Sequence, residues 1–134
     1  MPRMRSIHPE ACESETLSGL SRDAECLFWR LITQCDDYGR MRADPLLIAS
    51  RCYPLVPDFN SAYVGACLTE LHEAELIHLY TDGEHAYLAA ASWNKYQRPK
   101  NPSLPHHPAP NDCVQISAHD LRSDMQDFMP RAAF

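Results

Sequence analysis

The stretch from residue 60 to residue 97 constrains the fold more than any other part of the chain. Its first half repeats apolar residues at the three-and-four spacing of a helix with one buried face, namely Val64, Cys67, Leu68 and Leu71. Two short apolar runs, 76–80 and 86–89, then flank an Asp82-Gly83 turn. Asp-Gly between apolar runs is a strong hairpin signal because such turns need residues that tolerate positive φ. The stretch therefore predicts a helix that is followed directly by a β-hairpin.

Two more helices are predicted before this unit. The first starts after Ser21 as N-cap and has Asp23 and Glu25 in its first turn, where the helix dipole favours negative charge. Its apolar stripe consists of Ala24, Leu27, Phe28, Leu31 and Cys35. The second starts at Asp44-Pro45, because aspartate caps helices and proline is favoured at the first helical position. The helix before the hairpin is then the third.

A turn and a short strand are expected between the first two helices. Gly39 should close the first helix in the left-handed conformation. Residues 40–43 suffice for one strand, which is expected to pair with the hairpin. Three helices, a short strand and a hairpin in this arrangement are the plan of a winged helix-turn-helix, an α+β fold with a small antiparallel sheet. We expect residues 1–98, including an N-terminal arm, to form this domain.

The composition changes after the hairpin. Residues 99–110 contain five prolines and are expected to form neither a helix nor a central strand. We therefore predict a Pro-rich linker over residues 99–116. Residues 117–134 are expected to form a short C-terminal amphipathic segment. Within it, residues 117–129 are expected to form a helix with Ser117 as its cap and an apolar face of Leu121, Met125, Phe128 and Met129. A helix this short is only marginally stable alone, so it is expected to dock on another surface.

Charge and composition exclude several classes of protein. The chain of 134 residues carries a formal net charge of −6 and has a pI near 5.5, whereas a general nucleic-acid coat would be strongly basic. No apolar run approaches the ~20 residues that span a bilayer, so no membrane partner is expected. None of the six cysteines forms a C-x-x-C pair, which argues against a disulfide framework. We therefore expect a cytoplasmic protein.

Neither catalysis nor metal binding is indicated. The sequence lacks a G-x-S-x-G nucleophile motif, a Gly-rich phosphate loop and an H-E-x-x-H metal motif. The close Cys/His groupings are His106-His107 with Cys113, and Cys67 with His72. A structural zinc site needs paired ligands on both sides of a loop, and neither grouping has the second pair. We predict no enzyme activity, no metal and no cofactor.

In a winged helix the third helix enters a DNA groove, yet here its outward face has no Arg or Lys. Helical phase places Ala62, Ala66, Thr69 and Glu73 on that face, with Tyr63, Glu70 and His72 at its flanks. Guanine is read by Arg or Lys, and phosphate repels carboxylates. Contacts with the DNA backbone from flanking segments are therefore expected. The predicted DNA contacts are Arg3, Arg5, Arg40, Arg42, Tyr63, Thr69, Trp93, Asn94, Lys95, Tyr96, Arg98 and Lys100.

The segment from Ser92 to Lys100 has two interpretations. Aromatic and basic residues alternate with amides there, which suits stacking on bases and contact with phosphates. In the alternative, Trp93 and Tyr96 seal the sheet and the cations keep the chain soluble. Both interpretations remain open at this point.

A protein interface is also conceivable from the sequence. Trp29 lies away from the apolar stripe of the first helix, so the arm or the tail covers it, or it belongs to an interface. The acidic groups of the third helix and the apolar face of the tail would extend such an interface. The predicted interface residues are Trp29, Glu70, Glu73, Leu121, Met125 and Phe128.

Motifs spread over roughly residues 5–101 carry a family likeness. They are Arg5-Ser6-Ile7-His8-Pro9-Glu10, Leu17-x-x-Leu20-Ser21, the run from Asp36 to Pro45, Leu71-x-x-Ala74-x-Leu76-Ile77-x-Leu79-Tyr80, and Trp93-Asn94-Lys95-Tyr96-Gln97-Arg98. With these motifs the sequence resembles small winged-helix proteins of phages and prophages, many of them replication initiators or replisome organisers. The resemblance implies origin-DNA binding and recruitment of host replication proteins.

We therefore expect a phage-type winged-helix protein that binds DNA in replication initiation or phage gene regulation, in the cytoplasm of the host cell. The alternative is an acidic phage adaptor or inhibitor that binds a host replication or defence protein, with DNA mimicry as one mechanism. A homodimer through Trp29 is compatible with either.

Overall fold

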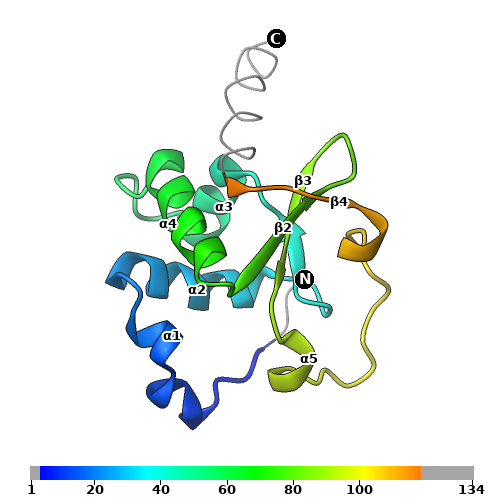
Figure 1. Cartoon of the computed structure of the whole chain (residues 1–134), viewed down its shortest axis with the longest axis horizontal. Helices are drawn as coiled ribbons and strands as arrows, with labels where there is room; N and C mark the ends of the chain where they lie inside the picture. Colours follow the sequence, from blue (N-terminus) through cyan, green and yellow to red (C-terminus); the bar gives the residue numbers. More distant parts are fainter. Residues whose placement is uncertain (1–3, 119–134) are drawn as a thin grey trace.

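The computed structural model describes residues 4–118 and shows an α+β fold, so the expected fold class is confirmed at this level (Figure 1). Helices pack on one face of an antiparallel sheet with the strand order β1-β3-β2-β4. The α-helices in this part of the chain are α1 (Glu15–Ser18), α2 (Arg22–Gln34), α3 (Pro45–Cys52), α4 (Ser61–Glu73) and α5 (Trp93–Tyr96). The strands are β1 (Arg40–Arg42), β2 (Ile77–Thr81), β3 (Ala86–Ala90) and β4 (Val114–Gln115), and the 3-10 helices are η1 (Pro9–Glu13) and η2 (Pro110–Asp112).

The three helices expected from the sequence are α2, α3 and α4, and each begins at a capping side chain. Ser21 accepts a hydrogen bond from a backbone N–H in the first turn of α2, and Asp44 does the same for α3. Asn60 accepts two such bonds at the start of α4. Because the first N–H groups of a helix have no partner within it, these acceptors fix where each helix starts. The predicted caps Ser21 and Asp44, and Pro45 at the first helical position, are confirmed.

The predicted hairpin is formed by β2 and β3, and β1 pairs with β3 as expected. The register places Met41, Leu88 and Leu79 side by side, and all three are buried in the main core. Since side chains alternate along a strand, Tyr80 and Tyr87 point to the opposite face. We call this opposite face, away from the helices, the outer face of the sheet.

The main core lies between α2, α3, α4 and the inner face of the sheet. Its most deeply buried side chains include Leu27, Leu31, Ile48, Val64, Leu68, Leu71, Ile77, Leu79 and Leu88. Cys52 and Cys67 belong to this core as free thiols, and burial raises the pKa of each to about 11. Both thiols are therefore neutral at physiological pH and act as small apolar side chains.

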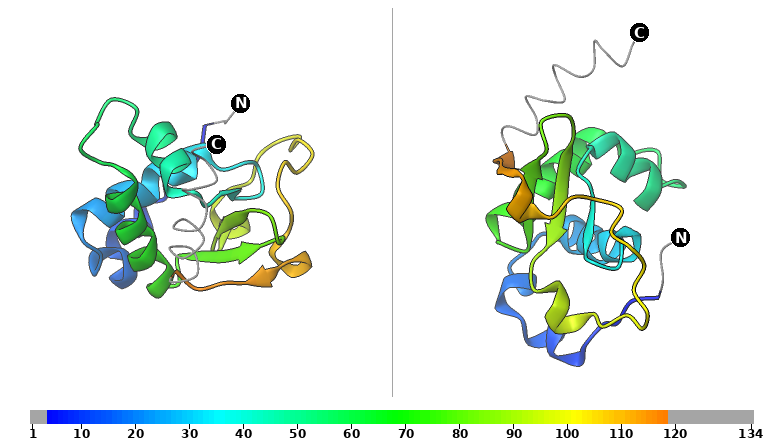
Figure 2. Two further views of the ribbon diagram at one scale, coloured as in Figure 1. Left: turned by 90° about the horizontal axis from the view of Figure 1, so that it is seen from above. Right: turned by 90° about the vertical axis from the view of Figure 1, so that its right-hand side faces the viewer.

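The proline-rich segment lies along the outer face of the sheet (Figure 2). Residues 103–113, which we call the strap, lead from the region after α5 to β4, and β4 pairs with β2. Cys113 packs with Tyr80, Tyr87 and Ala89 in a small second core. The prediction of a linker over residues 99–116 is therefore corrected, because part of this segment packs on the sheet and adds a strand to it. Proline removes backbone N–H donors, but it leaves carbonyl groups and rings available for tertiary contacts.

Candidate nucleic-acid interface

Trp93 anchors α5 to the body of the protein. Its indole Nε1 donates a hydrogen bond to the carbonyl oxygen of Asp37 at 2.8 Å, and the residue is only 6% exposed. The ring lies over Gly39, whose φ is +78°, and a Cβ built at Gly39 would be 2.6 Å from Cδ2 of Trp93. The expected left-handed conformation of Gly39 is thus confirmed, but the prediction that it closes the first helix is wrong, because α2 ends at Gln34 and the extended Cys35 is its C-cap. The prediction that Trp93 contacts DNA is corrected, because its buried ring offers no free face for a base.

Arg5 is buried beside this indole. Its Nη1 forms an ion pair with Oδ1 of Asp37 at 3.1 Å, and both side chains are 4% exposed. Its Nη2 donates to the carbonyl oxygen of Cys35 at 3.0 Å, and its guanidinium lies 5.0 Å from the centre of the Trp93 ring. A buried charge is tolerated when it is paired and hydrogen-bonded. Arg5 therefore holds the arm to the loop after α2, and its predicted contact with DNA is incompatible with this burial.

The N-terminal arm is attached to the end of α5. The buried side chain of Gln97 accepts a hydrogen bond from the Ser6 N–H and donates one to the Ser6 carbonyl, both at 2.8 Å. Nε2 of His8 lies 2.8 Å from the carbonyl oxygen of Tyr96, and the two rings meet edge to face at 5.2 Å. The arm and the segment after the hairpin, far apart in the sequence, thus lie side by side (Figure 1).

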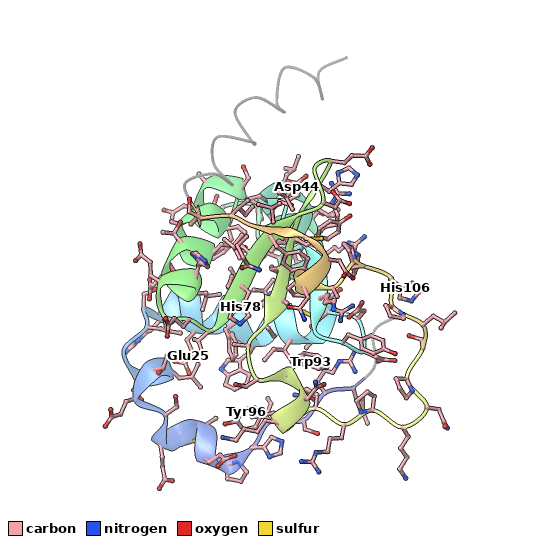
Figure 3. The ribbon with its side chains drawn as sticks, turned by 45° about the vertical axis from the view of Figure 1, so that its right-hand side comes forward. Glu25, Asp44, His78, Trp93, Tyr96 and His106 are labelled. Atoms are coloured by element: carbon pink, nitrogen blue, oxygen red, sulfur yellow. The ribbon has the colours of Figure 1, made fainter. Side chains whose placement is uncertain are left out.

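Exposed cations gather at this end of the molecule. Lys95, Arg98 and Lys100 are exposed, and we call these three residues the basic end. Asn94 is exposed between them, and Nζ of Lys95 lies 5.2 Å from the centre of the half-buried Tyr96 ring. Figure 3 shows Tyr96 and Trp93 together at this end. The residues after the hairpin that were predicted to contact DNA are therefore exposed or half-buried, except for the buried Trp93.

The arginines of β1 lie elsewhere, on the outer face of the sheet. Nη1 of Arg40 donates to the carbonyl oxygen of His107 at 3.2 Å, and its guanidinium lies 5.3 Å from the centre of the Tyr38 ring. Arg42 is half-buried, opposite Tyr87 in the strand register. The strap contacts this face, so Arg40 and Arg42 are not part of the basic end.

The outward face of α4 has no positive charge, as expected from the sequence. Tyr63 is 54% exposed near the start of the helix, and Glu73 is exposed at its end. Oγ1 of the half-buried Thr69 donates to the carbonyl oxygen of Gly65 within the helix. DNA contacts by Tyr63 and Thr69 stay predictions.

Two of the predicted interface residues are engaged within the chain. The Glu70 carboxylate accepts hydrogen bonds from the N–H and the hydroxyl of Ser21 at 2.6 and 2.9 Å, which ties α4 to the cap of α2. Trp29 is half-buried, packs against the main core and meets Phe28 edge to face at 5.2 Å. The remaining predicted site residues, Arg3, Leu121, Met125 and Phe128, lie outside the described residues.

The sequence does not point to Asp37 or Gln97, although both organise this end of the molecule. Asp36 and Asp37 look like a solvated pair at a turn. Asp36 fits that expectation, since it accepts hydrogen bonds from the N–H groups of Tyr38 and Arg40. Asp37 is instead only 7% exposed and is bonded to groups that lie more than thirty positions away. A local pattern carries no signal for such a contact.

Within residues 4–118, no three His, Cys, Asp or Glu side chains are placed to hold a metal ion. No helix in that range is long and apolar enough to cross a membrane. Comparison with models of known protein families, with functionally characterised proteins and with solved structures found no match.

Proposed function

We propose that the protein is a phage-type winged-helix protein that binds the DNA backbone, in replication initiation or phage gene regulation. The observation that carries this proposal is the gathering of Lys95, Arg98 and Lys100 at one end of the fold, while α4 has no Lys or Arg. The resemblance of the sequence to phage replication proteins supports the same class.

The element order supports the winged-helix part of the proposal. Helix α2, strand β1, helices α3 and α4 and the hairpin β2–β3 follow one another, and β1 lies beside β3 in the sheet. In a winged helix, α3 and α4 correspond to the helix-turn-helix and the hairpin to the wing. The class of fold therefore suits DNA, and the charges decide which surface meets it.

Charge favours the basic end over α4 and the hairpin. Glu73 on α4 and Asp82 and Glu84 in the hairpin turn are exposed. Hydrogen bonds from the backbone N–H groups of His85 and Glu84 lower the pKa of Asp82, so the turn is anionic at neutral pH. Phosphate repels these groups, whereas a Lys or Arg near a phosphate releases counterions and gains affinity. DNA that contacts the basic end avoids the acidic turn.

A salt titration of duplex-DNA binding tests this proposal. Three phosphate contacts predict that the logarithm of the binding constant falls with the logarithm of the salt concentration with a slope of about −2.7. The double variant Lys95→Ala with Arg98→Ala should reduce the magnitude of this slope by about 1.8. The matched control is Arg22→Ala with Arg51→Ala, which removes two exposed arginines from α2 and α3. The absence of salt-dependent binding below about 100 µM, or an equal loss in the control, would contradict the proposal.

An adaptor that binds a host protein is the second candidate, and a specific surface favours it. Leu55 is 90%, Val56 41% and Tyr63 54% exposed around the connection from α3 to α4. Tyr53, Phe59 and Tyr63 stack in succession, with ring centres 4.0 and 5.8 Å apart, which holds this surface in place. Exposed apolar side chains on a rigid base are typical of protein interfaces.

Co-purification from a host lysate, with and without nuclease, separates the two candidates. A partner that survives nuclease and is lost in Leu55→Asp with Tyr63→Ala supports the adaptor. A partner that nuclease releases supports DNA binding.

A further inference from the structure

The strap contacts the outer face of the sheet in the way a bound peptide would, through its backbone carbonyls. Three side chains of the body donate hydrogen bonds to these carbonyls: Tyr38 to Ser103 at 3.0 Å, Arg40 to His107 at 3.2 Å and Tyr80 to Pro108 at 2.8 Å. None of these bonds needs a particular strap side chain. Any extended segment with carbonyls at the same spacing therefore meets the same donors.

Aromatic rings form the floor under the strap. The rings of Tyr80 and Tyr87 stack at 5.7 Å, and the His107 ring lies 5.7 Å from that of Tyr87. Tyr80 is completely buried, and burial raises its pKa, so its hydroxyl stays protonated and remains a donor. Above this floor, Ala109 has φ −74° and ψ 146°, the values of a polyproline II helix. Grooves lined by aromatic side chains are the usual receptors for such proline-rich segments.

The strap does not satisfy every polar group at this face. Nε of Arg42 and Nδ1 of His85 are buried without a hydrogen-bond partner. Both residues adjoin Tyr87, Arg42 through the strand register and His85 through an edge-to-face ring contact at 6.4 Å. Buried polar groups are normally hydrogen-bonded. A ligand that brings a polar partner to this position gains interactions that the strap lacks.

Parts of the strap are exposed to solvent, and the strand that follows it is short. Strand β4 has two residues, and Leu104 is 84% exposed. Figure 3 shows His106 on this outer segment, and it is also exposed. Because a tethered segment competes at an effective concentration on the order of millimolar, a free ligand must outcompete it or wait for it to open.

We propose that the outer face of the sheet is a binding site for an extended proline-rich segment of a partner protein, which the strap occupies in the same chain. This proposal is independent of DNA binding, because it uses Tyr38, Arg40, Tyr80 and Tyr87 and none of the basic end. The partner's segment replaces the strap and accepts the same hydrogen bonds. The strap therefore keeps the site closed until the partner is present.

Fluorescence anisotropy with a labelled peptide of residues 99–112 tests the proposal. For this test the full chain carries Ser103→Ala and His107→Ala, which weaken the strap's attachment by removing its side-chain contacts with Asp37 and Tyr87 and leave the donors of the groove in place; we call this variant the opened chain. We expect this opened chain to bind the peptide at least tenfold more tightly than the unaltered chain. Adding Tyr80→Phe should weaken binding about three- to tenfold, because one hydrogen bond is lost. The matched control, Tyr63→Phe on α4, should leave binding unchanged.

A second measurement tests whether the site prefers proline-rich peptides. A peptide with alanine in place of Pro105, Pro108 and Pro110 should bind the opened chain more weakly than the parent peptide. If the opened chain does not fold, the unaltered chain is titrated with about 1 mM peptide instead. Peptide binding should then change the amide chemical shifts of residues in β2 and β3.

Four results would overturn the proposal. The first is no binding by the folded chain, and the second is equal binding of the alanine peptide. The third is a dimer of the opened chain that free peptide does not dissociate, which would show exchange of straps between two copies. Preferential binding of oligo-dT at this face would likewise argue against a peptide ligand.

Discussion

Gly39→Ala is the most direct test of how α5 is attached to the body. Gly39 has a φ of +78°, where a residue with a Cβ costs ~1–2 kcal/mol. The added Cβ would also lie 2.6, 2.7 and 2.8 Å from three atoms of the Trp93 ring, and such overpacking costs ~1–3 kcal/mol. The ring cannot retreat easily because its Nε1 is bonded to the Asp37 carbonyl. The combined loss is about 2–5 kcal/mol, which lowers Tm by roughly 10 °C or more.

The matched control is Gly83→Ala in the hairpin turn. Gly83 also has a positive φ, +99°, but nothing lies within 4 Å of the Cβ that the substitution adds. The control therefore has the backbone cost without the contact with Trp93. Urea unfolding measures the free energy of unfolding of both variants, and we expect Gly39→Ala to lose about 1–3 kcal/mol more than Gly83→Ala. Equal destabilisation of the two variants would refute the placement of Trp93 over Gly39.

Three further predictions concern other contacts. Arg5→Met should destabilise the chain by ~3–5 kcal/mol in urea, since it leaves the buried Asp37 carboxylate without its cation; a loss near zero would contradict the buried pair. Glu70→Ala should cost about 1 kcal/mol through the loss of its bonds to the α2 cap, while the exposed Glu73→Ala should change stability by less than about 0.5 kcal/mol. Burial lowers the pKa of His107 from its ordinary 6.5 and outweighs the opposing Asp36 charge, so closure of the strap is stabilised above pH 6.5 and loses stability as the pH falls below it. Hydrogen exchange of the β4 amides should therefore quicken on acidification in excess of its intrinsic pH dependence, and His107→Gln should abolish that excess.

The elements that the sequence predicts correctly are those whose causes are local. Ser21 and Asp44 cap N–H groups two or three positions ahead, and the Asp82-Gly83 turn joins strands that are adjacent in the chain. The apolar spacing in 64–71 likewise identified the buried face of α4. Each of these signals spans only a few residues, and tertiary contacts did not override them.

The candidate site was less predictable because its partners lie far apart in the sequence. Arg5 meets Asp37 across 32 positions, and the Trp93 indole meets the Asp37 carbonyl across 56. A surface arginine and a buried, paired one look the same in a single sequence. The strap was missed for a different reason: prolines show that a segment donates few hydrogen bonds, but not that its carbonyls accept them.

Amide chemical-shift mapping of the full chain with a short DNA duplex shows whether the basic end contacts the DNA backbone. We predict that residues 94–100 shift on titration, that the shifts reverse as salt is added, and that α4 and the hairpin turn stay unchanged. Shifts concentrated in 61–73 or in the hairpin turn would show that DNA enters at the helix and wing, and would contradict the account.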